Sequence, residues 1–261
     1  MILSSSRKSG ETMDYSPSRT VSPLPSFAQK GGWRSTKGEQ GRDPYDGLRA
    51  WSAVTHGVGI FLSVPGTALL VRRSLAYGQD LWHMVSLLIY GLSMICLYTA
   101  STLYHSLNVS VSGRLALRKY DHCSIALLIA GSYTPICLIC LRNEGLWGWV
   151  ILSVIWAMAA ASCGLSLLWI NSPRWLTSGV YLVMGWLALI AFYPLSKTLP
   201  AEGFLWLILG GVLYTTGGIL YAVKWPGKTN PHFGCHEIFH LFILAGSICH
   251  YLMMYRVIAI L

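Results

Sequence analysis

The sequence predicts an all-α fold, a bundle of seven transmembrane helices whose amino terminus faces the cytoplasm. Of the 261 residues, 54% are hydrophobic and only 11% are charged, a composition too apolar for a soluble domain of this length. Uncharged stretches of about 20 residues, which is the length needed to cross roughly 30 Å of hydrocarbon, recur along the chain. None consists of the segments of about ten residues, alternating between apolar and polar side chains, that a membrane β-barrel requires. We therefore expect helices that span a bilayer.

Seven uncharged stretches follow one another, and each is predicted to form one helix because charged residues bound it on both sides. Their ranges are Ala50 to Val71, Leu81 to Gly113, His122 to Leu141, Gly145 to Pro173, Trp175 to Ser196, Gly203 to Val223, and Ile238 to Tyr255. Together they define a predicted transmembrane domain over residues 46–261.

Residues 1–45 have a different composition, dominated by Ser, Pro, Gly, Lys and Arg, without helical or strand periodicity. We expect a disordered polar tail. Met1, Ile2 and Leu3 do not make the apolar core of a signal peptide. An organelle transit peptide is the alternative: Ser and Arg enrichment favours it, whereas the acidic residues of the tail oppose it.

The basic residues set the expected orientation, because Lys and Arg near helix ends favour the cytoplasmic side. With the amino terminus inside, fourteen Lys and Arg lie on that side and five on the other. The plasma membrane is the expected location, with an organellar membrane as the alternative. The net charge of +9 suits anionic lipid headgroups. Nucleic acid is not expected as a partner, because no basic face is interleaved with base-stacking aromatic residues.

Polar residues with ligand chemistry gather at the ends of three predicted helices. The run His236-Glu237-Ile238-Phe239-His240 opens the last helix, and imidazoles four residues apart lie on one helical face. Ser101 and His105 end the second helix, and Asp121 begins the third. In an up-and-down bundle these three ends share one side of the membrane. We therefore expect all five polar residues at one depth near one face.

These residue types predict a zinc centre. Three imidazoles, from His105, His236 and His240, supply the nitrogen ligands that zinc prefers and leave a position for water, as in catalytic sites. Asp121 is the candidate for holding and deprotonating that water for attack on a carbonyl; alternatively it caps the third helix. Ser101 is the candidate for orienting His105 or binding an oxyanion; alternatively it bonds the carbonyl one turn back.

The other histidines receive different interpretations. His83 and His250 are expected to be packed, hydrogen-bonded side chains rather than ligands. His122 points about 100° away from Asp121 around the helix, which makes it a poor ligand for the same ion. His56 is expected near the site, behind the ligands or facing a substrate. Cys235 is not expected to bind the metal.

Several ordered motifs then suggest a family. They are Thr55-His56-Gly57, Ser101-xxx-His105, Tyr120-Asp121-His122, Ala-Gly-Ser-Tyr-Thr-Pro at 130–135, and the His236 to His240 run followed by Ala-Gly-Ser at 245–247. With them the chain resembles the haemolysin III branch of the progestin and adipoQ receptor family, over about Trp51 to Tyr255. One departure is clear: bacterial members usually have acidic residues where this chain has Leu48 and Arg49, and Asn where it has Ser52.

The resemblance implies a seven-helix bundle with its amino terminus inside and a zinc ion near the cytoplasmic face. Zinc would be held by His105, His236 and His240, with Asp121 contacting it through water. The similar alkaline ceramidases imply hydrolysis of a lipid amide such as ceramide. Eukaryotic receptors of the family imply ligand-linked signalling, and its bacterial members carry a haemolysin label.

Three functions follow as hypotheses. The first is a zinc-dependent hydrolase acting on a membrane lipid amide or ester. The second is a receptor or regulator in which structural zinc ties the second and seventh helices together and a lipid shifts their packing. The third is an intramembrane metalloprotease with Glu237 as base, since H-E-x-x-H is the zincin signature. The protease is disfavoured because the third imidazole, that of His105, is predicted on another helix and an aspartate, Asp121, is already expected at the site. A pore is not expected, because like charges do not recur in rings.

Overall fold

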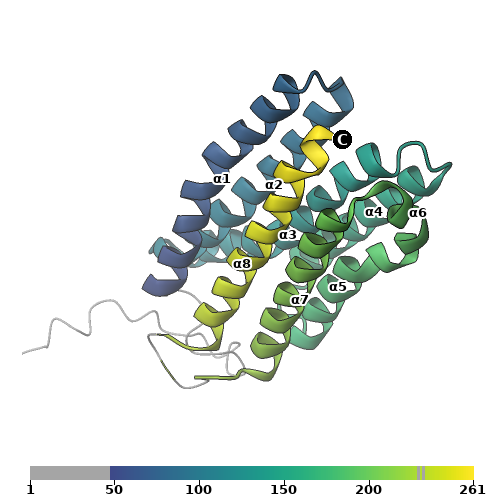
Figure 1. The fold of residues 1–261 in the computed structure, drawn as a ribbon. Coiled ribbons are helices and arrows are strands. Elements are labelled where there is room, and N and C mark those ends of the chain that lie inside the picture. Colours follow the sequence, from purple (N-terminus) through teal and green to yellow (C-terminus); the bar gives the residue numbers. More distant parts are fainter. Residues whose placement is uncertain (1–47, 228–229, 231–232) are drawn as a thin grey trace, which may run out of the picture. The chain divides into compact units, whose positions relative to one another are not determined.

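The structure is a computed structural model that describes residues 48–227, 230 and 233–261, and Figure 1 shows its fold. The tail expected over residues 1–45 lies outside the described residues. Within the described part, seven helical spans are long and apolar enough to cross a membrane. The predicted all-α bundle of seven spans is confirmed. A cytoplasmic amino terminus remains a prediction.

Five of the spans are built around a single α-helix. These are α1 (Ala50–Ala76), α2 (Leu81–Ser106), α4 (Trp147–Leu168), α7 (Ala201–Val223) and α8 (Cys235–Arg256), the last followed by the 3₁₀ turn η5 (Ile258–Ile260). The third span joins α3 (Val111–Pro135) to a π-helical turn, η3 (Ile136–Cys140). The fifth comprises α5 (Arg174–Trp186), the 3₁₀ turn η4 (Leu187–Ala191) and α6 (Phe192–Thr198).

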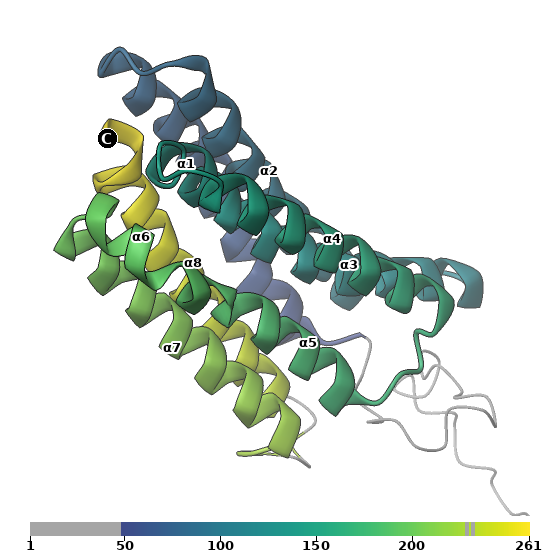
Figure 2. The same ribbon diagram turned by 90° about the vertical axis from the view of Figure 1, so that its right-hand side faces the viewer.

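The broken fifth span depends on one side chain of α3. Tyr133 donates its hydroxyl to the Gly185 carbonyl and accepts a hydrogen bond from the Ala188 N–H, each at 2.8 Å. Backbone groups in a membrane need a partner within the protein, and Tyr133 supplies it where the α-helical ladder is interrupted. Figure 2 shows this interruption between α5 and α6.

The third helix begins earlier than the charges predicted. Ser110 is the N-cap of α3 and its hydroxyl accepts a hydrogen bond from the Gly113 N–H at 3.2 Å. Asp121 therefore lies inside α3, and the prediction that it begins or caps this helix is wrong. Two basic residues are accommodated because they reach carbonyl groups: Arg114 donates to Tyr104 at 2.8 Å, and Lys119 donates to Leu167 at 2.6 Å.

Sequential packing places the first and the last helix of the described chain against each other. Each of α1 to α4 packs on the next helix, while α8 packs on both α7 and α1 and lies between them in Figure 1. Close approach of α1 and α2 requires small residues, as is usual between membrane helices. A Cβ on Gly91 would lie 2.3 Å from the Thr67 side chain. The start of α8 is thereby brought beside the start of α1 and the end of α2.

Candidate metal centre

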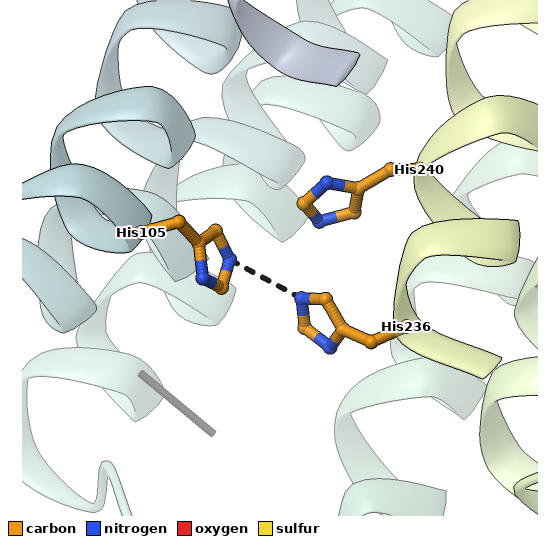
Figure 3. A group of neighbouring side chains, drawn as sticks. All are labelled: His105, His236 and His240. Carbon is orange, nitrogen blue, oxygen red and sulfur yellow. Dashed lines mark hydrogen bonds between the residues drawn. The ribbon is translucent and has the colours of Figure 1, made fainter. Parts of the chain in front are cut away.

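Three imidazoles meet where α2 ends and α8 begins. His105 comes from the last turn of α2, and His236 and His240 come from the first two turns of α8 (Figure 3). One ring nitrogen from each of the three lies within 4.8 Å of the others. The structure thus brings together the three histidines that the sequence predicted as ligands.

One pair of these nitrogens has the spacing expected at a zinc ion. Zinc–nitrogen bonds of about 2.0–2.1 Å in tetrahedral geometry place two bound nitrogens roughly 3.3 Å apart. The Nε2 atoms of His105 and His236 are 3.2 Å apart. Ring centroids of His240 lie 4.6 Å from His236 and 5.2 Å from His105. A donor set of three imidazoles is also one that zinc prefers over magnesium or calcium.

The backbone and a hydroxyl of α1 orient the His240 ring. Its Nδ1 lies 3.3 Å from the Ser52 carbonyl oxygen and 3.4 Å from Thr55 Oγ1. A carbonyl oxygen only accepts hydrogen bonds, so the contact with Ser52 requires the proton on Nδ1. This tautomer leaves the lone pair of Nε2 for a metal, the arrangement by which outer residues usually fix a ligating histidine.

His56 is stacked on the same ring. Its centroid is 3.6 Å from that of His240, and the two planes differ by 9°. The Tyr98 ring packs edge-on against His56, with the centroids 5.2 Å apart. His56 is buried, and neither ring nitrogen has a hydrogen-bond partner among the described residues. The sequence placed His56 near the site, and the structure puts it in contact with a predicted ligand.

A long cavity reaches two of the three imidazoles, those of His236 and His240, from within the bundle. Its volume is about 260 Å³, close to the lower end of the roughly 300–1,000 Å³ typical of small-molecule sites. Ser101, Asp121, His236 and His240 line it, and so do residues from both ends of α7, from Phe204 to Tyr221. The cavity therefore runs along the bundle. Polar side chains line the end where α8 begins, and its walls are mostly apolar elsewhere.

Both predicted catalytic residues face this cavity. The hydroxyl of Ser101 is buried and makes no hydrogen bond to any residue in the described ranges, so the alternative bond to the carbonyl one turn back is not observed. Asp121 lines the same cavity from α3, although it lies outside the group of three imidazoles. Their chemical roles stay predictions.

The remaining candidates lie apart from the imidazole group. His83 bonds the N-cap residue Asp80, with its Nδ1 2.7 Å from the carboxylate, and His250 Nε2 lies 3.4 Å from the Leu207 carbonyl oxygen. His122 lines the cavity but is not in the group, and neither is Cys235.

One part of the site was missed by sequence reasoning. Glu237 is fully buried and accepts hydrogen bonds from Arg49, Ser52 and the Gly234 N–H. Arg49 and Ser52 are two of the positions at which the sequence departs from the bacterial pattern. They now prove to be the partners of the acid inside the H-E-x-x-H run.

Comparison with known proteins identifies the family of this chain. A family described as haemolysin-III related matches residues 49–251. A hemolysin-3 homolog from Bacillus subtilis (strain 168) is 40% identical over 196 residues, which cover 75% of this chain and 87% of the relative. Hemolysin-3 from Bacillus cereus is 37% identical over 197 residues, or 75% and 85% of the two chains.

A more distant human relative matches a similar share of the chain. The monocyte to macrophage differentiation factor of Homo sapiens is 28% identical over 214 residues, covering 79% of this chain and 83% of its own length. The family match, over residues 49–251, includes the spans that carry the three imidazoles. The chain is therefore a multi-pass integral membrane protein and belongs to the haemolysin III-related family.

Proposed function

We propose that this protein is a zinc-dependent hydrolase of a membrane lipid amide or ester, similar in activity to a ceramidase. One observation carries the proposal: two of the three convergent imidazoles line one long and mostly apolar cavity together with the Asp121 carboxylate and the buried Ser101 hydroxyl, which has no hydrogen-bond partner among the described residues. A lipid has the matching shape, with a polar linkage at one end of an apolar chain. The proposed site lies near the cytoplasmic face.

In this proposal His105, His236 and His240 hold the zinc ion. Zinc, when bound, polarises a carbonyl and lowers the pKa of its water toward about 7. Asp121 accepts the proton of the attacking water, since its carboxylate faces the same cavity. Ser101 donates its free hydroxyl to the oxygen that gains negative charge in the transition state. The apolar walls hold the acyl chain and exclude bulk water.

The protease hypothesis receives no support from Glu237. A zincin base must reach the attacking water with a free carboxylate oxygen. Here Oε1 accepts from Arg49 Nε at 2.5 Å and Ser52 Oγ at 2.7 Å, while Oε2 accepts from Arg49 Nη2 at 2.7 Å and the Gly234 N–H at 2.8 Å. This carboxylate is fully engaged in protein contacts, so we assign the proton transfer to Asp121.

A receptor or regulator with structural zinc is the second candidate. The observation that favours it is that the three imidazoles join α2 to α8, so an ion there would tie two helices that are far apart in the sequence. A lipid in the cavity would then alter their packing. Its partner would be the same class of membrane lipid.

Metal analysis and turnover of the purified protein test the proposal. Wild type should contain one zinc per chain, and replacing each of the three histidines in turn by Ala should remove it. Asp121→Asn should keep the zinc but abolish hydrolysis of ceramides and other long-chain lipid amides or esters. Asp80→Asn, outside the cavity, is the control and should hydrolyse normally.

The outcomes separate the candidates. Turnover retained by Asp121→Asn would end the proposed mechanism. If the wild type contains zinc but hydrolyses none of these lipids, and His240→Ala loses the zinc and lowers the melting temperature, the structural-zinc candidate replaces it. Cleavage of a membrane-span peptide that is lost in Glu237→Gln would instead support the protease.

A further inference from the structure

Arg49 and Glu237 form an ion pair in the protein interior. Their relative exposures are 8% and 0%. The guanidinium donates hydrogen bonds to both carboxylate oxygens, at 2.5 and 2.7 Å. Parallel hydrogen bonds of this kind fix the mutual orientation of two planar groups as well as their distance. Ser52 Oγ and the Gly234 N–H fill the remaining acceptor sites of Glu237.

Residues 49–52, just before and within the first turn of α1, contact both helices that carry the predicted ligands, α2 with His105 and α8 with His236 and His240. The N–H of Arg49 donates to the carbonyl of His105 at 3.0 Å, at the end of α2. Its side chain holds Glu237, which lies between His236 and His240 in α8. Ser52 adds a second link to α8, since its carbonyl oxygen is 3.3 Å from His240 Nδ1. Residues 49–52 thus connect the two helix ends that meet at the imidazoles.

We propose that Arg49 and Glu237 are positioning residues that set the distance between the first turn of α8 and the last turn of α2, and with it the geometry of the three imidazoles. This inference rests on the proposed zinc site. The pair does not open easily, because separation would leave a buried charge without a partner. Metal ligands need such support, since a site that is loose by about 1 Å binds poorly.

Stability alone gives a poor account of the pair. Replacing a buried ion pair by apolar residues of similar volume is often neutral or stabilising, because both charges lose their hydration in the folded protein. What an apolar pair cannot supply is the fixed geometry of a forked hydrogen bond. Removing both charges together therefore separates positioning from stability, which a single replacement does not.

The test uses the full-length protein in detergent and compares two double variants. Arg49→Met with Glu237→Met removes the pair at the start of α8. Arg256→Met with Glu202→Met removes an ion pair between the other ends of α8 and α7, where Arg256 Nε lies 2.5 Å from Glu202 Oε1. For each protein the zinc dissociation constant is measured by competition with a chelator, alongside the melting temperature.

We expect the first double variant to melt close to the wild type and to bind zinc about 10–100-fold more weakly, the range seen when outer supports of metal ligands are lost. The control variant should bind zinc normally. Arg49→Lys, which keeps the charge but loses the fork, should bind with intermediate affinity. Wild-type zinc affinity in the first double variant would overturn the inference and leave the proposed zinc site intact.

If the wild-type protein binds no zinc, the proposed metal function is refuted, and the positioning role needs a second measurement. Hydrogen exchange of residues 235–240 in metal-free protein then decides the positioning role. Faster exchange in the first double variant than in the control variant would support it. Equal exchange in the two variants would overturn it.

Discussion

The imidazole of His56 lies flat on that of His240, with ring centroids 3.6 Å apart and planes inclined by only 9°. His56 is buried and makes no hydrogen bond through its nitrogens to any residue that the structure describes. Its contribution to the site is therefore the contact of ring faces, which limits the directions in which His240 can turn.

We expect His56→Ala to lower the free energy of unfolding by about 2–5 kcal/mol, as other large-to-small replacements in packed interiors do. His56→Phe keeps a ring of similar shape and should cost less than about 1.5 kcal/mol. Reversible unfolding in detergent measures both. His56→Phe should also retain zinc; if it loses the metal, His56 is a ligand and the three-histidine site is incomplete.

Gly59 allows Tyr98 to reach His56. A Cβ on Gly59 would lie 2.3–2.6 Å from the Tyr98 ring, whereas a Cβ on Gly57 would meet nothing within 4 Å. Gly59→Ala should therefore destabilise the protein by about 1–3 kcal/mol, because the ring has to move. Gly57→Ala, two residues earlier in α1, should be neutral or stabilising by up to about 1 kcal/mol, since Ala favours a helix over Gly. Equal melting temperatures of the two variants would contradict the close packing.

Thr55 is one of two groups that contact His240 Nδ1. Thr55→Val keeps the shape of the side chain but removes the hydroxyl, and we expect zinc affinity to fall by about tenfold. Thr67→Val is the matched control in the same helix, because the Thr67 hydroxyl bonds only the Ser63 carbonyl among its described contacts. It should bind zinc as the wild type does. An unchanged affinity for Thr55→Val would show that the Ser52 carbonyl orients the ring alone.

Asp80 provides a prediction for pH at the other end of the bundle. Hydrogen bonds from His83 and from Arg142 hold the pKa of its carboxyl well below the usual value of about 3.9. A depressed pKa in the folded state adds stability above the unfolded pKa and loses it as the pH falls toward the folded pKa. The difference in melting temperature between wild type and Asp80→Asn should therefore shrink as the pH falls below about 4. A difference that grows below pH 4 would contradict this assignment.

Much of the fold followed from the sequence, because a bilayer imposes a minimum length on every uncharged segment. The start of α3 did not, since Arg114 and Lys119 find carbonyl partners and the helix continues past them. The break between α5 and α6 could not be predicted either. The backbone groups left without helical partners there are hydrogen-bonded by the Tyr133 hydroxyl, which belongs to another span.

The three imidazoles could be predicted because helix periodicity and the parity of the spans both constrain where they lie. The Arg49–Glu237 pair could not, because its members are 188 residues apart and neither position belongs to a periodic pattern. The contact between His56 and His240 was only partly foreseen: sequence placed His56 nearby, while ring stacking depends on the packing of α1 against α8.

The position of Arg49 has a practical consequence for shortened versions of this protein. Arg49 lies one residue before α1, at the second of the residues that the structure describes. A chain that starts at residue 48 would retain the counter-ion of Glu237, whereas one that starts at residue 50 would strand a carboxylate in the interior. Expression yield should therefore be lower for the chain that starts at residue 50 than for the one that starts at residue 48.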